Sequence, residues 1–142
     1  MNLETLQDKW KEDSVIDPDK YGEESVRIPQ LHMRYMEFYN TFSLMKKDRE
    51  SEMKALVRDK WIYYKGKAPT AVYKEMPFDL KLTTTDEIRM FIAGDDEIRK
   101  LQYKIDYIEQ TIFFLDGVLR QLNSRNYQIK NAIEWERFQS GM

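Results

Sequence analysis

The sequence predicts a mainly α protein built from long helices, with a short extended or β segment near residues 70–83 and a C-terminal helical hairpin that forms an oligomerisation core. Three observations predict this class. Apolar residues recur at steps of three and four along most of the chain, which is the period of a helix with one buried face. Only five glycines and four prolines occur in 142 residues. Two of those prolines, and most of the irregular sequence, fall between residues 66 and 85.

Length and composition indicate one domain, residues 1–142, with three parts. Residues 1–67 are expected to form N-terminal helices that carry a basic and aromatic segment, residues 68–84 an extended linker, and residues 85–142 a C-terminal helical assembly region. Charged residues make up 34% and hydrophobic residues 42%, which is typical of a folded polar chain. Because the net charge is −2, binding to nucleic acid requires a local basic patch, or one patch repeated by symmetry.

Several classes of protein are not expected. The chain has no cysteine, and it contains no P-loop, dinucleotide glycine fingerprint or nucleophile elbow. His32, the only histidine, fits a surface or packing role, and the acids Asp95-Asp96-Glu97 fit a helix start better than a metal site. We therefore expect no catalytic residue, no metal and no cofactor, and a binding protein instead of an enzyme. The absence of a signal-peptide core or a long apolar run favours an intracellular, soluble protein with no membrane partner.

The N-terminal half is predicted to be three helices. The spacing of Leu3, Leu6 and Trp10 predicts a short amphipathic helix over residues 2–12. Asp17-Pro18 resembles a helix start, so a second helix is expected from there to about Arg27. Pro29 predicts a break or kink, because proline lacks the backbone donor and restricts the residue before it.

A long third helix is expected from Pro29 to Tyr64. Its apolar stripe is Leu31, Tyr35, Phe38, Phe42 and Met45, and it resumes at Met53, Leu56 and Val57. The charged run over residues 46–52 is read as a solvated stretch of helix, although Lys46, Lys47 and Arg49 could extend a basic patch. Gly66 is a natural stop, since glycine adopts a left-handed conformation without steric cost.

The segment from Gly66 to Thr85 is the least regular. Phe78–Leu82 alternates apolar and polar residues, so we expect an extended segment or short strand that pairs with Ala71–Lys74 or with a neighbouring subunit. Thr84 stands three residues before Glu87, the spacing of a capping box, and predicts a short helix over residues 85–92. Gly94 should end that helix and Asp95 should cap the next.

The C-terminal helix has the clearest pattern in the chain. Aliphatic residues fill every a and d position of four heptads, and we assign them to oligomerisation. They are Ile98, Leu101, Ile105, Ile108, Ile112, Leu115, Leu119 and Leu122. Other apolar residues, among them Phe113 and Val118, lie off this seam, so one surface is expected to pack within the subunit and the other against neighbouring subunits. The alternative is that both serve one monomeric core. Asn123–Asn126 is expected to end the helix, and a terminal helix containing Ile129 and Ile133 should fold back on it.

A basic and aromatic segment, Met53–Lys67, is the candidate DNA-binding site. Cations that neutralise phosphates, next to rings on which bases stack, are what a sequence-tolerant single-strand binder needs. The candidate residues are Lys54, Arg58, Lys60, Trp61, Tyr63, Tyr64, Lys65 and Lys67. The alternative is that the cations offset the helix dipole and the rings belong to the core.

The chain resembles the UvsY family, the recombination mediators of T-even-type bacteriophages. The resemblance covers nearly the full length and rests on an ordered set of short matches. These are Leu3-Glu4-Thr5-Leu6-Gln7, Ile16-Asp17, Lys54-Ala55-Leu56, Tyr63-Tyr64-Lys65-Gly66, Ser124-Arg125, Ile129-Lys130 and Glu136-Arg137-Phe138. The segment Lys67–Phe78 matches least.

The resemblance implies a function and a set of partners. It implies a ring-shaped homo-oligomer of about six or seven subunits that binds single-stranded DNA in the host cell cytoplasm. The ring would help load a RecA-like phage recombinase onto DNA covered by the phage single-strand DNA-binding protein. The family's DNA contacts fall on Arg58 and Lys60, with the order of Arg and Lys exchanged, which changes the geometry offered to phosphate. The alternative function is a coiled-coil scaffold or regulatory protein without DNA binding.

Overall fold

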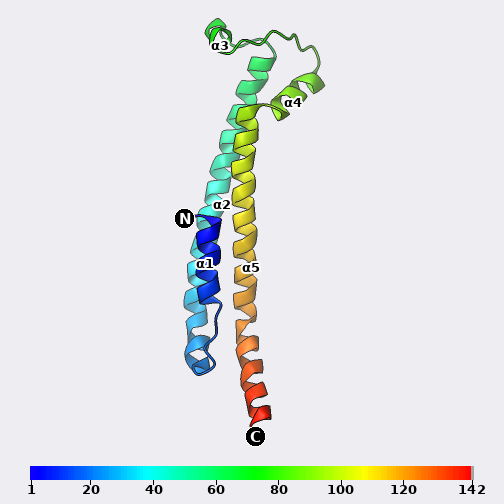
Figure 1. Cartoon of the computed structure of the whole chain (residues 1–142). Coiled ribbons are helices and arrows are strands. Elements are labelled where there is room, and N and C mark those ends of the chain that lie inside the picture. Colours follow the sequence, from blue (N-terminus) through cyan, green and yellow to red (C-terminus); the bar gives the residue numbers. More distant parts are fainter. Residues whose placement is uncertain (142) are drawn as a thin grey trace. The chain divides into compact units, whose positions relative to one another are not determined.

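The computed structural model describes Met1–Gly141, and within that range it contains five helices and no strand. They are α1 Leu3–Asp13, α2 Tyr21–Tyr64, α3 Thr70–Glu75, α4 Thr85–Ala93 and α5 Asp96–Gln139 (Figure 1). The mainly α class is therefore confirmed. None of the helices in the described range is both long enough and apolar enough to cross a membrane.

The chain divides into two compact units, and α2 and α5 contribute to both. Unit 1 comprises Met1–Ser43 and Glu109–Met142, and unit 2 comprises Leu44–Ile108. Unit 1 therefore contains α1, the first part of α2 and the second part of α5. Unit 2 contains the second part of α2, the helices α3 and α4, and the first part of α5. The organisation as a single domain stays a prediction.

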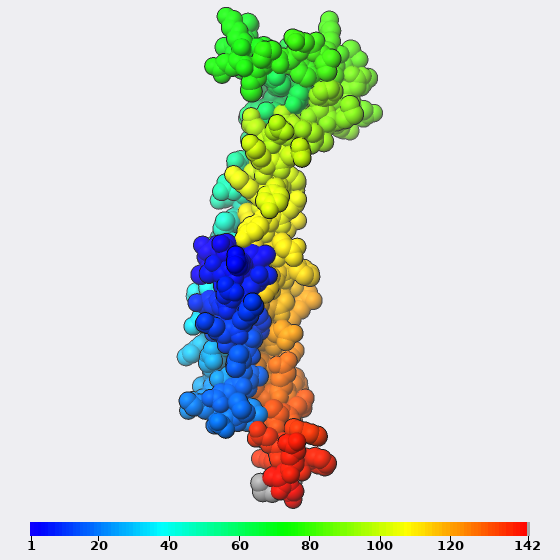
Figure 2. Space-filling model, viewed as in Figure 1, coloured from blue at the N-terminus to red at the C-terminus, as the bar shows by residue number. Residues whose placement is uncertain are grey.

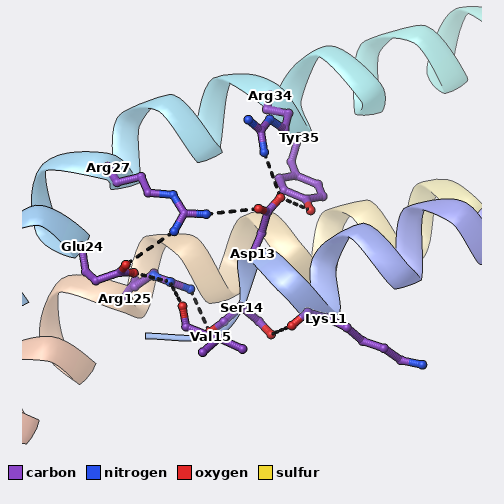
Figure 3. A network of polar contacts seen from close by, with 9 residues as sticks. All are labelled: Lys11, Asp13, Ser14, Val15, Glu24, Arg27, Arg34, Tyr35 and Arg125. Atoms are coloured by element: carbon purple, nitrogen blue, oxygen red, sulfur yellow. Dashed lines mark hydrogen bonds and ion pairs between the residues drawn. The ribbon is translucent and has the colours of Figure 1, made fainter. Parts of the chain in front are cut away.

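In unit 1, α1 packs on α2 through a ring contact and a buried acid. The Trp10 and Tyr35 rings meet edge to face with centroids 5.4 Å apart. Asp13, at the end of α1, accepts hydrogen bonds from Arg27 at 3.1 Å, Arg34 at 3.1 Å and the Tyr35 hydroxyl at 2.8 Å (Figure 3). Because a buried carboxylate is stable only with such partners, this cluster fixes where α1 ends. Figure 2 shows α1, in blue, on the surface of this unit.

The predicted C-terminal hairpin is wrong, because α5 runs without interruption from Asp96 to Gln139. Arg125 lies in the predicted break but is only 3% exposed. Its guanidinium donates to the carbonyls of Ser14 and Val15 and to Glu24 (Figure 3). With Leu122 and Ile129 buried on either side, Arg125 continues the steps of three and four as a polar residue of the same seam. These contacts outweigh the weak helix propensity of the asparagines.

The predicted break at Pro29 is also wrong, since α2 passes through this residue. Pro29 lies on the exposed side of the helix, where water can reach the carbonyl that proline leaves unpaired. Ile28 and Leu31 are buried next to it, and their packing offsets the cost of the lost hydrogen bond. The helix begins at Tyr21, later than predicted, because Asp17 accepts from the Asp19 N–H at 2.9 Å and forms a turn first.

The predicted strand near residues 70–83 is not formed. Residues 70–75 are α3, and residues 77–83 have no regular structure. Alternation in Phe78–Leu82 therefore reflects packing of single side chains, because Leu82 contacts a core of Ile88, Ile92 and Ile98. The capping predictions are confirmed: the Thr84 hydroxyl accepts from the Glu87 N–H at 3.2 Å, and Gly94 follows the end of α4.

The heptad seam of α5 is buried within the chain. Seven of its eight residues are less than 9% exposed, and Ile112 is half-buried. Between Ile108 and Leu115 the fully buried position is Thr111. The helical prediction for this stretch is thus confirmed, and these side chains form the subunit's own core. Their assignment to contacts between subunits stays a prediction.

Candidate nucleic-acid interface

The candidate interface is the second part of α2, which ends in a Schellman motif. The Lys67 N–H donates to the Ile62 carbonyl at 3.1 Å, and the Gly66 N–H donates to the Tyr63 carbonyl at 3.1 Å. Gly66 has φ of 81°, the left-handed conformation that this motif requires. The predicted stop is therefore formed as expected, and it leaves Lys65 and Lys67 exposed at the helix end.

Four cations form one stripe along the solvent side of α2, which we call the basic stripe: Lys47, Lys54, Arg58 and Lys65. Their spacings of seven, four and seven residues are close to whole helical turns, so the four Cα–Cβ directions fall within about 40° over roughly 27 Å of helix. All four are exposed. A row of exposed cations on one helix face is suited to follow a phosphate backbone.

Three of the acids near the basic stripe pair with other cations, or only weakly with the stripe itself. Glu50 pairs with Lys46 at 3.7 Å, and Glu52 pairs with Arg49 at 2.9 Å. Arg58 contacts Asp59 at 3.1 Å, but their side chains are 69% and 62% exposed. An ion pair this exposed contributes little, so it does not prevent Arg58 from binding an anion.

Lys60 lies on the opposite side of α2. Only 8% of the residue is exposed. Its Nζ pairs with Asp95 Oδ2 at 3.3 Å and donates to Glu97 Oε1 at 3.2 Å. Burial acts to lower the pKa of Lys60, but hydrogen bonds to Glu97 and Asp95 and their charges outweigh it and raise the pKa above its ordinary value. Lys60 is therefore charged and neutralised inside the unit.

Asp95 connects this ion pair to the start of α5 and to Tyr64. It accepts from the N–H groups of Glu97 at 2.9 Å and Ile98 at 3.3 Å, as an N-cap does, and from the Tyr64 hydroxyl at 2.6 Å. Burial acts to raise the pKa of Asp95, but the hydrogen bonds from Tyr64, Ile98 and Lys60 outweigh it and lower the pKa. Burial, and next the bond to Asp95, raise the pKa of Tyr64, so the tyrosine keeps its proton.

The predicted aromatic residues pack within unit 2. Tyr63 stacks on Tyr73 with centroids 5.3 Å apart, and its hydroxyl donates to the Met76 carbonyl at 2.9 Å. Tyr64 meets Phe78 edge to face at 5.0 Å. Trp61 packs against the core of isoleucines from α4 and α5. These rings hold the segment between α2 and α5, drawn in green in Figure 2, and are not free platforms for bases.

Charge is distributed unequally between the two units. Unit 2 contains 14 basic and 12 acidic residues, for a net charge of +2. Unit 1 contains 9 basic and 13 acidic residues, for a net charge of −4. An acidic chain thus carries one unit with a small basic excess, and this unit contains the basic stripe.

The structure thus separates the eight predicted DNA-binding residues into two groups. Lys54, Arg58, Lys65 and Lys67 are exposed, whereas Lys60 and the three aromatic residues take part in packing. The heptad spacing from Lys47 to Lys54 is the sequence signal that adds Lys47 to the stripe. Within Met1–Gly141, no group of three or more histidines and carboxylates is arranged to hold a metal ion.

Comparisons with protein-family models, with curated proteins and with solved structures all identify similarity to the same family. Residues 9–142 match the family model described as "Recombination, repair and ssDNA binding protein UvsY". The recombination protein uvsY of Enterobacteria phage T4 is 24% identical over 144 residues, which cover 99% of each chain.

Two crystal structures of the bacteriophage T4 recombination mediator protein UvsY, in lattice types IV and II, share the fold. For lattice type IV the TM-score is 0.81 and the identity 22%, covering 98% of this chain and 99% of that one. For lattice type II the TM-score is 0.85 and the identity 21%, covering 99% of this chain and 98% of that one.

Proposed function

This chain belongs to the UvsY family of recombination, repair and single-stranded DNA binding proteins, and we propose that its basic stripe is the surface that contacts DNA. Lys47, Lys54, Arg58 and Lys65 each bind a backbone phosphate in this proposal, and Lys67 extends the path beyond the end of α2. The observation that carries it is the placement of four exposed cations on one face of a helix in the unit with a basic excess.

Binding by this surface is independent of sequence. Phosphates are the same at every nucleotide, and the rings of Trp61, Tyr63 and Tyr64 remain in the packing of unit 2. A single stripe binds weakly because it makes only a few solvent-exposed contacts. Several stripes presented by one assembly bind the same strand with higher avidity.

The assembly is a ring of about six or seven copies in this proposal. The heptad seam is occupied within the chain, so the surface available to a neighbouring copy is the other side of α5. Large apolar side chains there are more than half exposed: Tyr103, Phe113, Tyr127, Trp135 and Phe138. Trp135 and Phe138 stack with centroids 5.7 Å apart. Exposed aromatic surface of this kind is typical of an interface.

The assembly acts as a mediator without a catalytic step of its own. By binding and bending a strand at several stripes, it loosens the phage single-strand DNA-binding protein from that strand. The freed backbone is then available to a RecA-like phage recombinase, which supplies nucleotide hydrolysis. All of these partners meet in the host cell cytoplasm.

The experiment is a titration of fluorescent oligo(dT) by anisotropy at several salt concentrations. Replacing Lys47, Lys54, Arg58 and Lys65 by alanine should weaken binding about fivefold per lost phosphate contact near 0.1 M salt. The slope of log K against log salt should become shallower by about 0.7 for each contact. The control is Lys20→Ala, an exposed cation of unit 1, which should bind like the native protein. Native affinity in the folded fourfold variant would contradict the proposal.

A further inference from the structure

We infer that Lys60 supports DNA binding as a positioning residue that holds the end of α2 on the start of α5, and not as a phosphate ligand. This inference rests on the proposed function, because it concerns which cations of the same helix contact DNA. Arg58 and Lys60 carry the same charge and are two residues apart, so the sequence gives no reason to treat them differently.

Their directions on the helix separate them. Two residues rotate the Cα–Cβ direction by about 200°, so Arg58 and Lys60 point to opposite sides of α2. The Arg58 side chain is 69% exposed and the Lys60 side chain 10%. One strand that follows the basic stripe therefore cannot contact both without unwinding the helix.

The partners of Lys60 also oppose a phosphate. Its Nζ lies 3.3 Å from Asp95 and 3.2 Å from Glu97, so the cluster of three groups has a net charge of −1. A phosphate that approached Lys60 would meet two carboxylates and would have to displace both. Such a site repels an anion, in contrast to the stripe on the far side of the helix.

The contacts of Lys60 join the last turn of α2 to the start of α5. Asp95 caps α5 and also accepts from Tyr64, whose ring packs on Phe78 and Phe91. Lys60 is the counter-ion of Asp95, the carboxylate that makes both of these contacts. The Lys60 Nζ also lies 5.8 Å from the centroid of the Tyr63 ring. Without Lys60 the buried Asp95 loses its counter-ion, and the last turn of α2, which presents Lys65, is no longer held in place.

The first test needs no variant. The native assembly is acetylated with and without oligo(dT), and lysine modification is read by mass spectrometry. We expect Lys54 and Lys65 to react in the free protein and to be protected by DNA, and Lys60 to be unreactive in both states. A Lys60 that reacts readily and is protected by DNA would overturn the inference. Unprotected Lys54 and Lys65 would instead overturn the proposed stripe.

The second test separates positioning from contact by a double-mutant cycle of Lys60→Met and Asp95→Asn in the anisotropy titration. Lys60→Met should bind oligo(dT) about threefold to tenfold more weakly with an unchanged salt slope. Adding Asp95→Asn should restore most of the affinity, because it removes the uncompensated charge and keeps one oxygen that can accept a hydrogen bond at this position. Native affinity in Lys60→Met, no recovery in the double variant, or a slope shallower by about 0.7 would each overturn the inference. If Lys60→Met does not fold, as judged by circular dichroism, the acetylation result decides.

Discussion

Unit 1 and unit 2 each bury a cation between distant segments of the chain, but the net charges of the two units have opposite signs. In unit 1, Arg125 joins Glu24 and the Ser14 and Val15 carbonyls. In unit 2, Lys60 joins Asp95 and Glu97. The net charge is −4 in the first and +2 in the second. The number of cations in a segment is therefore a poor guide to binding, because the direction of each side chain decides whether it is available to a ligand.

The largest expected effect is on unit 1. Arg125→Met leaves the Glu24 carboxylate buried without its main partner, so the free energy of unfolding should fall by about 3 kcal/mol. The control is Arg120→Met, whose side chain is 80% exposed and pairs with Asp116 at the surface. It should cost less than about 1 kcal/mol. Urea unfolding followed by circular dichroism measures both, and equal losses would show that Arg125 is not a structural ion-pair partner.

The next effect is a pH dependence in unit 2. The pKa of Asp95 is lower in the folded protein than its ordinary value, so its ionised form stabilises the fold above the unfolded-state pKa. That stabilisation is lost as the pH falls through the folded-state pKa. Asp95→Asn should therefore be about 1–2 kcal/mol less stable than the native chain at neutral pH, with the two converging in acid.

Thermal melting across pH measures this convergence. The matched control is Asp79→Asn, an exposed acid of the segment between α3 and α4, and its melting curve should follow that of the native protein at every pH. A constant difference between Asp95→Asn and the native chain down to the most acidic pH would mean that the charge of Asp95 does not stabilise unit 2.

The smallest effects have opposite signs in the two units. Gly66→Ala, in unit 2, places a Cβ on a residue with φ of 81° and should cost about 1 kcal/mol. Gly117→Ala, in unit 1, lies inside α5, where the new Cβ meets nothing within 4 Å beyond the adjacent backbone of its own helix, and should stabilise the protein by about 0.5–1 kcal/mol. Chemical denaturation of both variants is the measurement. A Gly66→Ala variant that is as stable as the native chain or more stable would contradict the left-handed conformation assigned to Gly66, and a destabilised Gly117→Ala would contradict the open helical site assigned to Gly117.

Local signals in the sequence predicted the local structure well. The first helix, the cap at Thr84, the cap at Asp95 and the stop at Gly66 each depend on groups within a few residues, and all are formed. The heptads likewise predicted where α5 is buried, because a helix with such a stripe has to cover it.

Three of the failures have the same kind of physical cause, which is a contact with a residue outside the local segment. The helix continues through Asn123–Asn126 because Arg125 binds Glu24, which is 101 residues away. Lys60 is buried instead of exposed because it donates a hydrogen bond to Glu97, which is 37 residues away in the chain. The alternation in Phe78–Leu82 indicated a strand, but the residues that Leu82 packs against belong to helices. Spacing along the chain contains none of this information.

The most direct test of the account places a photoreactive benzoylphenylalanine on α2 and asks which position crosslinks to labelled single-stranded DNA. Ser51 is exposed between Lys47 and Lys54 and lies on the basic stripe. Gln30 is exposed on the same helix in unit 1 and serves as the control. We expect a crosslink from position 51 that high salt suppresses, and none from position 30. A crosslink from position 30 alone would contradict the assignment of DNA binding to unit 2.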